Sequence, residues 1–222
     1  HGAHDVTPPD QPRSKIPETC AKCHSTIYNE YKESVHGDAL INGGNQDVPT
    51  CIDCHGVHNI EDPLTASFRL KSPQMCAGCH TNVALMAKYG LNTDVLNTYV
   101  ADFHGATVEL FARQSPDHAT NKAVCYDCHG IHNIKSVTDP EATVVKENLL
   151  NTCRQCHPDA TANFPASWVG HYQASPERYP LVYYVNLFYK ILIPAVVGFF
   201  AAFVSLDIVR SLINRFRQGR GA

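Results

Sequence analysis

The sequence predicts a mostly α-helical and irregular domain that is followed by one C-terminal transmembrane helix. Five C-x-x-C-H motifs lie between residues 20 and 157, and each suits one short helical turn. Long alternations of apolar and polar residues, which would indicate β-strands, are not evident between the motifs. After Leu181 the composition changes to an apolar run with very few charges.

The 222-residue chain divides into four predicted parts. The motifs are preceded by a Pro-rich leader, "HGAHDVTPPDQP", which is expected to be extended. The parts are the leader (1–19), the domain that holds the five motifs (20–175), the transmembrane helix (181–209) and a basic tail (210–222).

Charge is distributed unevenly along the chain. There are 18 basic and 21 acidic residues, but five basic residues and only one acidic residue lie beyond Leu181. Residues 1–180 therefore carry an excess of seven acidic groups. Because a nucleic-acid-binding domain needs a basic surface, we expect no nucleic acid among the partners.

All ten cysteines belong to C-x-x-C-H motifs. Disulfides would give no reason for a histidine after every second cysteine, and a four-thiolate zinc site consumes two pairs, so five is an odd number. C-x-x-C-H is instead the attachment signature of c-type haem, and it predicts five covalently attached haem c groups. The predicted attachment residues are Cys20, Cys23, Cys51, Cys54, Cys76, Cys79, Cys125, Cys128, Cys153 and Cys156.

The motif spacing has a mechanical reason. Residues i, i+3 and i+4 of a helical turn share one face, so two thiols can bond one macrocycle while the adjacent imidazole reaches its iron. With about 31 residues per motif, the domain cannot build a large conventional core, and the macrocycles must supply much of the buried apolar surface. The predicted proximal ligands are His24, His55, His80, His129 and His157.

An internal repeat selects the ligands of the opposite metal face. Methionine cannot be the general ligand, because Met75 directly precedes a motif cysteine and only Met86 remains. The chain reads as two and a half units of C-x-x-C-H … H … C-x-x-C-H-G-x-H-N-I. Each unit places one histidine between its motifs and one just after the second motif. The distal candidates are His36, His58, His104, His132 and His171.

Two histidine doublets, His55/His58 and His129/His132, carry a further expectation. Two residues this close in sequence cannot bind opposite faces of one porphyrin, so the second histidine of each doublet should face a neighbouring haem. Gly56 and Gly130 would allow the tight turn between the ligands. Which distal histidine serves which iron stays open, as does whether His118, His1 or His4 replaces one of the five.

The C-terminal run has the properties of a membrane span. Residues 191–206 are uncharged and cover roughly 24 Å as a helix, so the span must include part of the segment 181–189. Tyrosines before the run form an aromatic belt, and four arginines after Asp207 satisfy the positive-inside rule. We therefore expect a single-pass protein of the cytoplasmic membrane, with a periplasmic or outer haem domain and a cytoplasmic C-terminus.

The five motifs, the H-G pairs at His36 and His104 and the C-H-G-x-H doublets resemble membrane-anchored multihaem cytochromes of the cytochrome c3 or doubled-C-x-x-C-H kind. The resemblance covers residues 20–175. It implies low-spin bis-histidine haems that carry electrons between the membrane quinone pool and soluble or extracellular carriers. It also implies a membrane-bound redox partner, such as a cytochrome b-like subunit.

The expected function is that of an electron-transfer subunit of a membrane redox complex, not of an enzyme by itself. The quinone pool, reached directly or through a partner, and the lipid bilayer are further expected partners. With both axial positions filled, no iron is open to a substrate. The alternative is a multihaem reductase that has one open haem site and acts on a small oxyanion or nitrogen oxide.

Overall fold

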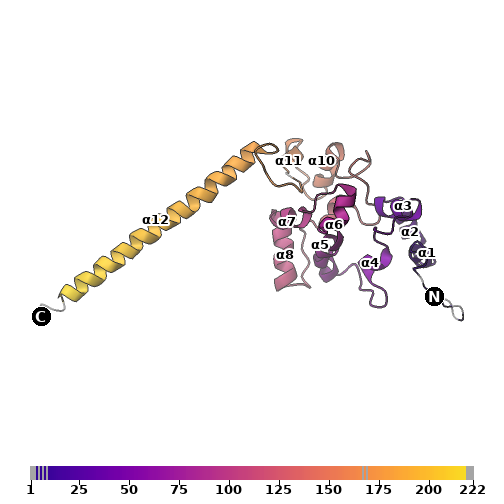
Figure 1. Ribbon diagram of the computed structural model, residues 1–222, viewed down its shortest axis with the longest axis horizontal. Helices are drawn as coiled ribbons and strands as arrows, with labels where there is room; N and C mark the ends of the chain where they lie inside the picture. The colour runs from indigo at the N-terminus through magenta and orange to yellow at the C-terminus, as the bar shows by residue number, and fades with distance from the viewer. Residues whose placement is uncertain are drawn as a thin grey trace. The chain divides into compact units, whose positions relative to one another are not determined.

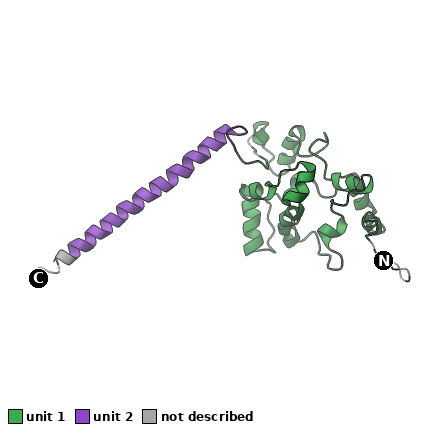
Figure 2. Cartoon of the chain, in the orientation of Figure 1, with its two compact units in different colours: residues 1–172 green, residues 173–222 purple. Residues whose placement is uncertain are grey.

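A computed structural model describes residues 4, 6, 8, 10–166, 168 and 170–218, without the side chains of 216–218. This part of the chain is mostly helical and contains no strand, which confirms the α and irregular fold class in its coarse form. The chain forms two compact units, residues 1–172 and 173–222 (Figure 2). The tail residue Arg220 and the leader residue His1 lie outside the described residues.

The first unit contains short helices joined by turns and loops (Figure 1). Helix α1 begins inside the predicted leader, because residues 13–15 already form a turn that leads into it. The elements, in order, are α1 (Lys15–Ala21), α2 (Ser25–Lys32), α3 (Val35–Ile41), α4 (Cys51–His55), α5 (Ala66–His80), α6 (Val83–Met86), the 3-10 helix η1 (Ala87–Tyr89), α7 (Val95–Val100), α8 (Phe103–Gln114), α9 (Cys125–His129), α10 (Lys146–Arg154) and α11 (Asn163–Ala166).

The C-x-x-C-H motifs take two structural forms. The second and fourth motifs are five-residue helices of their own, α4 and α9. Each ends at a glycine with positive φ, 76° at Gly56 and 82° at Gly130, as the tight turn within each doublet requires. The first, third and fifth motifs lie at the C-terminal ends of α1, α5 and α10.

The two helices that carry His36 and His104 pack in the same way. A Cβ on Gly37 would lie 1.9 Å from the carbonyl oxygen of Tyr31, and one on Gly105 would lie 2.1 Å from that of Tyr99. Only glycine therefore lets α3 and α8 approach the preceding backbone this closely. The phenol groups of these tyrosines donate 2.8 Å hydrogen bonds to the carbonyl oxygens of Pro49 and Ala123, just before α4 and α9.

The apolar core of the first unit is small. Leu70 of α5, Val108 of α8 and Val124 before α9 form its one described cluster, against which Phe111 and Tyr126 pack. Several other apolar side chains near the motifs are exposed, among them Val57 and Ile60 of the first doublet and Ile131 of the second. The polypeptide by itself thus leaves much apolar surface uncovered.

The second unit is dominated by α12 (Pro180–Gln218), a helix of 39 residues. The most apolar 18-residue window within Pro180–Arg215 has a mean hydropathy of 2.3, and no part of that window is buried within the protein. It is long and apolar enough to cross a membrane. The helix continues beyond the predicted span 181–209 into the predicted tail, because residues 210–218 contain no helix-breaking glycine or proline.

Candidate functional site

Histidines of the first compact unit, residues 1–172, lie in pairs. The ring centres are 6.2 Å apart for His36 and His80, and 6.2 Å for His55 and His132. Two further pairs have nearly the same separation. They are His104 with His157, 6.1 Å apart, and His129 with His171, 6.0 Å apart. Every pair joins one motif histidine to one histidine from outside the motifs.

This separation suits two imidazoles on opposite faces of one metal ion. A metal–imidazole bond is about 2 Å long and each ring centre lies about 1.1 Å behind its nitrogen, so the centres would be about 6.2 Å apart. Ordinary aromatic contacts also reach this distance. What distinguishes the four pairs is their composition and their near-constant spacing, whereas the other ring contacts of histidines vary from 5.0 Å for His157–Phe164 to 6.4 Å for Phe103–His104.

The pairs follow a rule across the repeat. His36, which lies between the first two motifs, faces the third motif, and His104, between the third and fourth motifs, faces the fifth. In the opposite direction, His132 after the fourth motif faces His55 of the second. Each of these histidines therefore reaches a motif two positions away, and each pair ties two units of the repeat together.

The second doublet is arranged as its spacing requires. His132 lies against His55, while its sequence neighbour His129 lies against His171. Each histidine of this doublet thus belongs to a different pair. The backbone of Gly130 and Ile131 is all that separates the two pairs along the chain.

The remaining histidines lie outside these four pairs. His24 and His58 are both exposed, and the charge of His24 acts on His55. His118 is exposed and its ring stacks on Phe111 at 5.6 Å. His4 is exposed.

Burial keeps several paired imidazoles neutral. Burial, followed by the proximity of His80, lowers the pKa of His36 to about 4. Burial and then the nearby His171 and His80 lower the pKa of His129 to about 4 as well. Burial is also the first cause of the lowered pKa values of His55, His80, His132 and His171. A neutral imidazole keeps the nitrogen lone pair that a metal requires.

Second contacts orient some of the paired rings. Nδ1 of His104 lies 3.2 Å from a carboxylate oxygen of Asp102, which also accepts a hydrogen bond from the His104 backbone N–H. Nδ1 of His171 lies 3.4 Å from the hydroxyl of Thr98. With Nδ1 engaged in this way, Nε2 of each ring is the nitrogen left to bind a metal, as expected for imidazole ligands.

The motif thiols are free and form a continuous series. The thiols of Cys20 and Cys51 are in hydrogen-bonding contact, and so are those of Cys76 and Cys125. Burial and then the Cys20 thiol raise the pKa of Cys51 to about 12.

Electrostatic proximity links the remaining neighbours in this series. Burial first, and then the thiols of the third motif, raise the pKa of Cys54 to about 11. Burial, Asp127 and the thiols of the fifth motif do the same for Cys128. The five motifs therefore follow one another in space in the order of the sequence.

These groups fit covalent haem better than zinc. A closed tetrahedral zinc site needs four protein donors, and the described residues contain no group of three or more metal-binding side chains. An axially ligated haem needs only two protein nitrogens, because the porphyrin supplies the others. Paired histidines with two thiols beside one member match that requirement.

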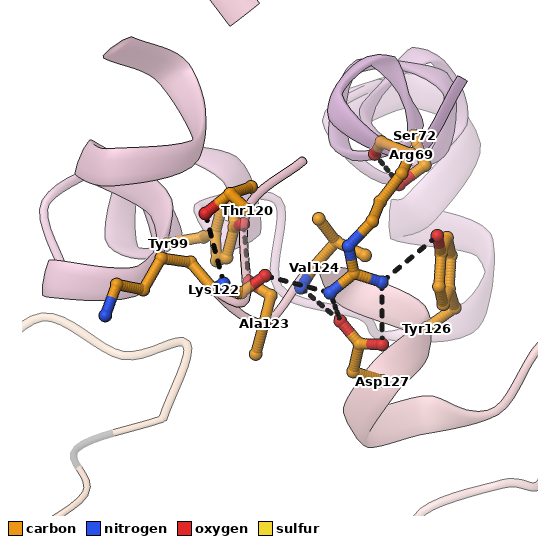
Figure 3. A network of polar contacts seen from close by, with 9 residues as sticks. All are labelled: Arg69, Ser72, Tyr99, Thr120, Lys122, Ala123, Val124, Tyr126 and Asp127. Atoms are coloured by element: carbon orange, nitrogen blue, oxygen red, sulfur yellow. Dashed lines mark hydrogen bonds and ion pairs between the residues drawn. The ribbon is translucent and has the colours of Figure 1, made fainter. Parts of the chain in front are cut away.

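Two arginines complete the site, and the motif analysis did not find them. Arg13 forms an ion pair with Asp53 of the second motif, 2.6 Å, and Arg69 forms one with Asp127 of the fourth, 2.7 Å (Figure 3). Arg13 lies seven residues before Cys20 of the first motif, and Arg69 lies seven residues before Cys76 of the third motif. That common offset is the signal in the sequence that would have revealed them.

Comparison with known proteins gives no further guide. No protein-family model matches the chain, and no solved structure matches it.

Proposed function

We propose that this chain is a membrane-anchored pentahaem c-type cytochrome that relays electrons and is not an enzyme by itself. The observation that supports this most strongly is the set of four histidine pairs, 6.0–6.2 Å apart, each beside a C-x-x-C pair. When bound, haem supplies one-electron redox chemistry at iron.

The residues of the chain would hold and insulate the cofactors. The two cysteines of each motif would form the covalent attachment, and the two imidazoles of each pair would both bind the iron. Exposed apolar side chains beside the motifs, such as Val57, Ile60 and Ile131, would cover the macrocycle edges and exclude water. Filling both axial positions keeps substrates off the iron, so the protein conducts electrons without transforming a substrate.

The order of the motifs supports a single relay. Thiol contacts and electrostatic proximity join the first motif to the second, the second to the third, and so on to the fifth. Each electron would then pass between motifs in sequence order. The fifth motif is the nearest to α12 along the chain, which favours electron exchange with a membrane partner at that end.

The membrane part of the proposal rests on α12. Its apolar run would cross the bilayer once, with the haem domain on the periplasmic or outer side and the arginine-rich end in the cytoplasm. One helix forms a poor pocket for a quinone, so a membrane-bound redox subunit, such as a cytochrome b-like protein, would connect the relay to the quinone pool. A soluble or extracellular carrier would exchange electrons at the other end.

The competing function is a reductase with one open haem. Its candidate location is the first motif, because His24 is exposed and lies outside the four pairs described above. A small oxyanion or nitrogen oxide could reach an iron there if no distal ligand bound it.

Two measurements on the full-length protein in detergent test the proposal. The mass of the purified chain should exceed that of the polypeptide by five haem groups, and electron paramagnetic resonance should show low-spin iron throughout. Carbon monoxide added to the reduced protein should leave the spectrum unchanged. Fewer attached haems would contradict the proposal, and one stoichiometric carbon monoxide complex would favour the reductase.

A further inference from the structure

The ion pairs of Arg13 and Arg69 are equivalent elements of the two complete units. The guanidinium of Arg13 lies 2.6 Å from a carboxylate oxygen of Asp53, and that of Arg69 lies 2.7 Å and 3.0 Å from the two oxygens of Asp127. Each aspartate stands two residues after the first cysteine of its motif. The two units thus keep the same charge pair in the same register.

Each arginine makes a second equivalent contact. Arg13 also donates to the carbonyl oxygen of Val48 at 3.4 Å, and Arg69 donates to that of Lys122 at 2.9 Å. Both carbonyls lie three residues before the first cysteine of the even-numbered motif. The arginine therefore binds both the approach to the motif helix and the carboxylate inside it (Figure 3).

Each aspartate is fixed from the other side as well. Asp53 accepts hydrogen bonds from the backbone N–H of Thr50 at 2.6 Å and from its hydroxyl at 2.8 Å. Asp127 accepts one from the backbone N–H of Val124 at 2.6 Å. The carboxylate thus caps the N-terminus of α4 or α9 and binds the arginine at the same time.

These contacts join the two motif helices of one unit. Arg13 precedes α1, which carries the first motif, and Asp53 lies in α4, which carries the second. Arg69 lies in α5 and Asp127 in α9, the helices of the third and fourth motifs. The same two junctions have the thiol contacts between first cysteines.

We propose that the two arginine–aspartate pairs are positioning residues that set the spacing and the electrostatic potential within each two-haem unit. This inference rests on the proposed electron-transfer function. Arginine and carboxylate are each about a quarter to a third exposed, 26% and 29% for Arg69 and Asp127, so their charges act on a haem attached within the same helix through partly excluded water.

The half-unit provides a matched control. Lys146 stands seven residues before Cys153, the position that Arg13 and Arg69 hold before their motifs. Lys146 is exposed, and the half-unit has no later motif that could supply an aspartate. Replacing Lys146 removes one positive charge at the same position before a motif and breaks no arginine–aspartate pair.

The test measures the reduction potentials and the haem–haem coupling of five full-length variants. In Arg69→Gln the half of the pair left behind is negative, so one haem potential should shift down. In Asp127→Asn the remaining charge is positive, so the potential should shift up. The double variant should return close to the wild-type potential, and Arg69→Lys should restore most of it. Lys146→Gln should leave potentials within error of wild type.

Coupling supplies a readout independent of charge. The exciton-coupled circular dichroism of neighbouring haems should lose amplitude in Arg69→Gln and in the double variant, because the two helices of the unit are no longer tied. Equal shifts of the same sign in Arg69→Gln and Asp127→Asn, or unchanged coupling in Arg69→Gln and in the double variant, would overturn the inference. If these variants do not fold, Arg13→Gln and Asp53→Asn apply the same test in the first repeat of the sequence.

Failure of this inference differs from failure of the proposed function. A wild-type protein that lacks five attached haems contradicts the function before any variant is made. If every variant keeps five low-spin haems with unchanged potentials and coupling, the proposed function stands. Only the positioning role of the two arginine–aspartate pairs is then contradicted.

Discussion

The complete units and the half-unit deliver their distal histidines in different ways. In the complete units His36 and His104 stand in the first turn of a helix, and the following glycine is pressed against a tyrosine backbone. In the half-unit His171 follows Gly170 in a loop, and its backbone carbonyl accepts a hydrogen bond from the side chain of Asn92. Both arrangements reach the same ring separation, so the spacing of the pair does not depend on the local structure that carries it.

The difference has a physical origin in the repeat. A helix-borne histidine is positioned by packing within its own unit and reaches forward to the next one. After the fifth motif no further complete unit exists, and His129 receives its partner from a loop that docks on α7 through Thr98. The loop substitutes for the doublet histidine that a third complete unit would have provided.

The largest expected effect concerns acid, and it applies to both kinds of pair. The pKa values of His36 and His129 are lowered in the folded protein from 6.5 to about 4, so these imidazoles stay neutral as pH falls through 6.5. Their contribution to stability is present above 6.5 and is lost as pH falls towards 4. The free energy of unfolding, measured with denaturant, should therefore not change on their account from pH 8 to 7 and should fall between pH 6.5 and 4. A free energy of unfolding that stays constant from pH 8 down to pH 4 would contradict the burial of these pairs.

Replacing one distal ligand should affect one haem in five. His36→Ala should convert a single haem to high spin and allow one carbon monoxide per molecule, because the position opposite His80 is emptied. His171→Ala should do the same opposite His129. Optical titration and electron paramagnetic resonance count the altered haems.

A double replacement tests the pairing itself. In His36→Ala/His80→Ala the same cofactor is affected twice, so four low-spin haems should remain. In His36→Ala/His157→Ala two cofactors are affected, and three should remain. Three low-spin haems in the first variant would show that His36 and His80 do not share a metal.

An added methyl group at the close helix contact should cost less than a lost ligand. Gly105→Ala forces α8 away from Tyr99, and overpacking of this kind typically costs about 1–3 kcal/mol of unfolding free energy. Gly37→Ala should lower the free energy of unfolding by a similar amount, because Gly37 makes the same close contact in the first repeat. Gly78→Ala is the control inside a motif, because a methyl group added there would meet nothing within 4 Å. Thermal unfolding of the three variants compares them, and equal loss in all three would remove the packing argument.

Much of this arrangement could be predicted from the sequence, because covalent chemistry and local spacing determine it. The C-x-x-C-H spacing marks one helical turn, and the repeat marks the histidines that the structure brings into four pairs. The positive φ of Gly56 and Gly130 was foreseeable from the turn that each doublet needs. The break between α7 and α8 has a local cause, since the chain turns at Ala101 and Asp102 and the Asp102 side chain caps α8.

The partner of each ligand could not be predicted, because it depends on how whole units pack. Nothing local to His132 indicates that it faces His55, 77 positions earlier in the chain. The ion pair of Arg69 with Asp127 likewise joins residues 58 positions apart. The only sign of such contacts in the sequence is that the arginine precedes its motif by the same number of residues in both repeats. One sequence offers just two complete repeats to compare.

The smallest expected effect lies in the loop that carries His171. Thr98→Val removes the hydroxyl that lies 3.4 Å from Nδ1 of His171 and keeps the shape of the side chain. The contact is long for a hydrogen bond, so its loss should cost less than about 1 kcal/mol. We expect all five haems to remain low-spin, with a small change in the potential of the haem opposite His171, because ring orientation there has no helix to maintain it. Redox titration of Thr98→Val beside Thr107→Val, a half-buried threonine on α8 whose hydroxyl donates to the Phe103 carbonyl of its own helix, measures this difference. Identical titrations for the two variants would mean that the loop, like the helices, positions its histidine by backbone packing alone.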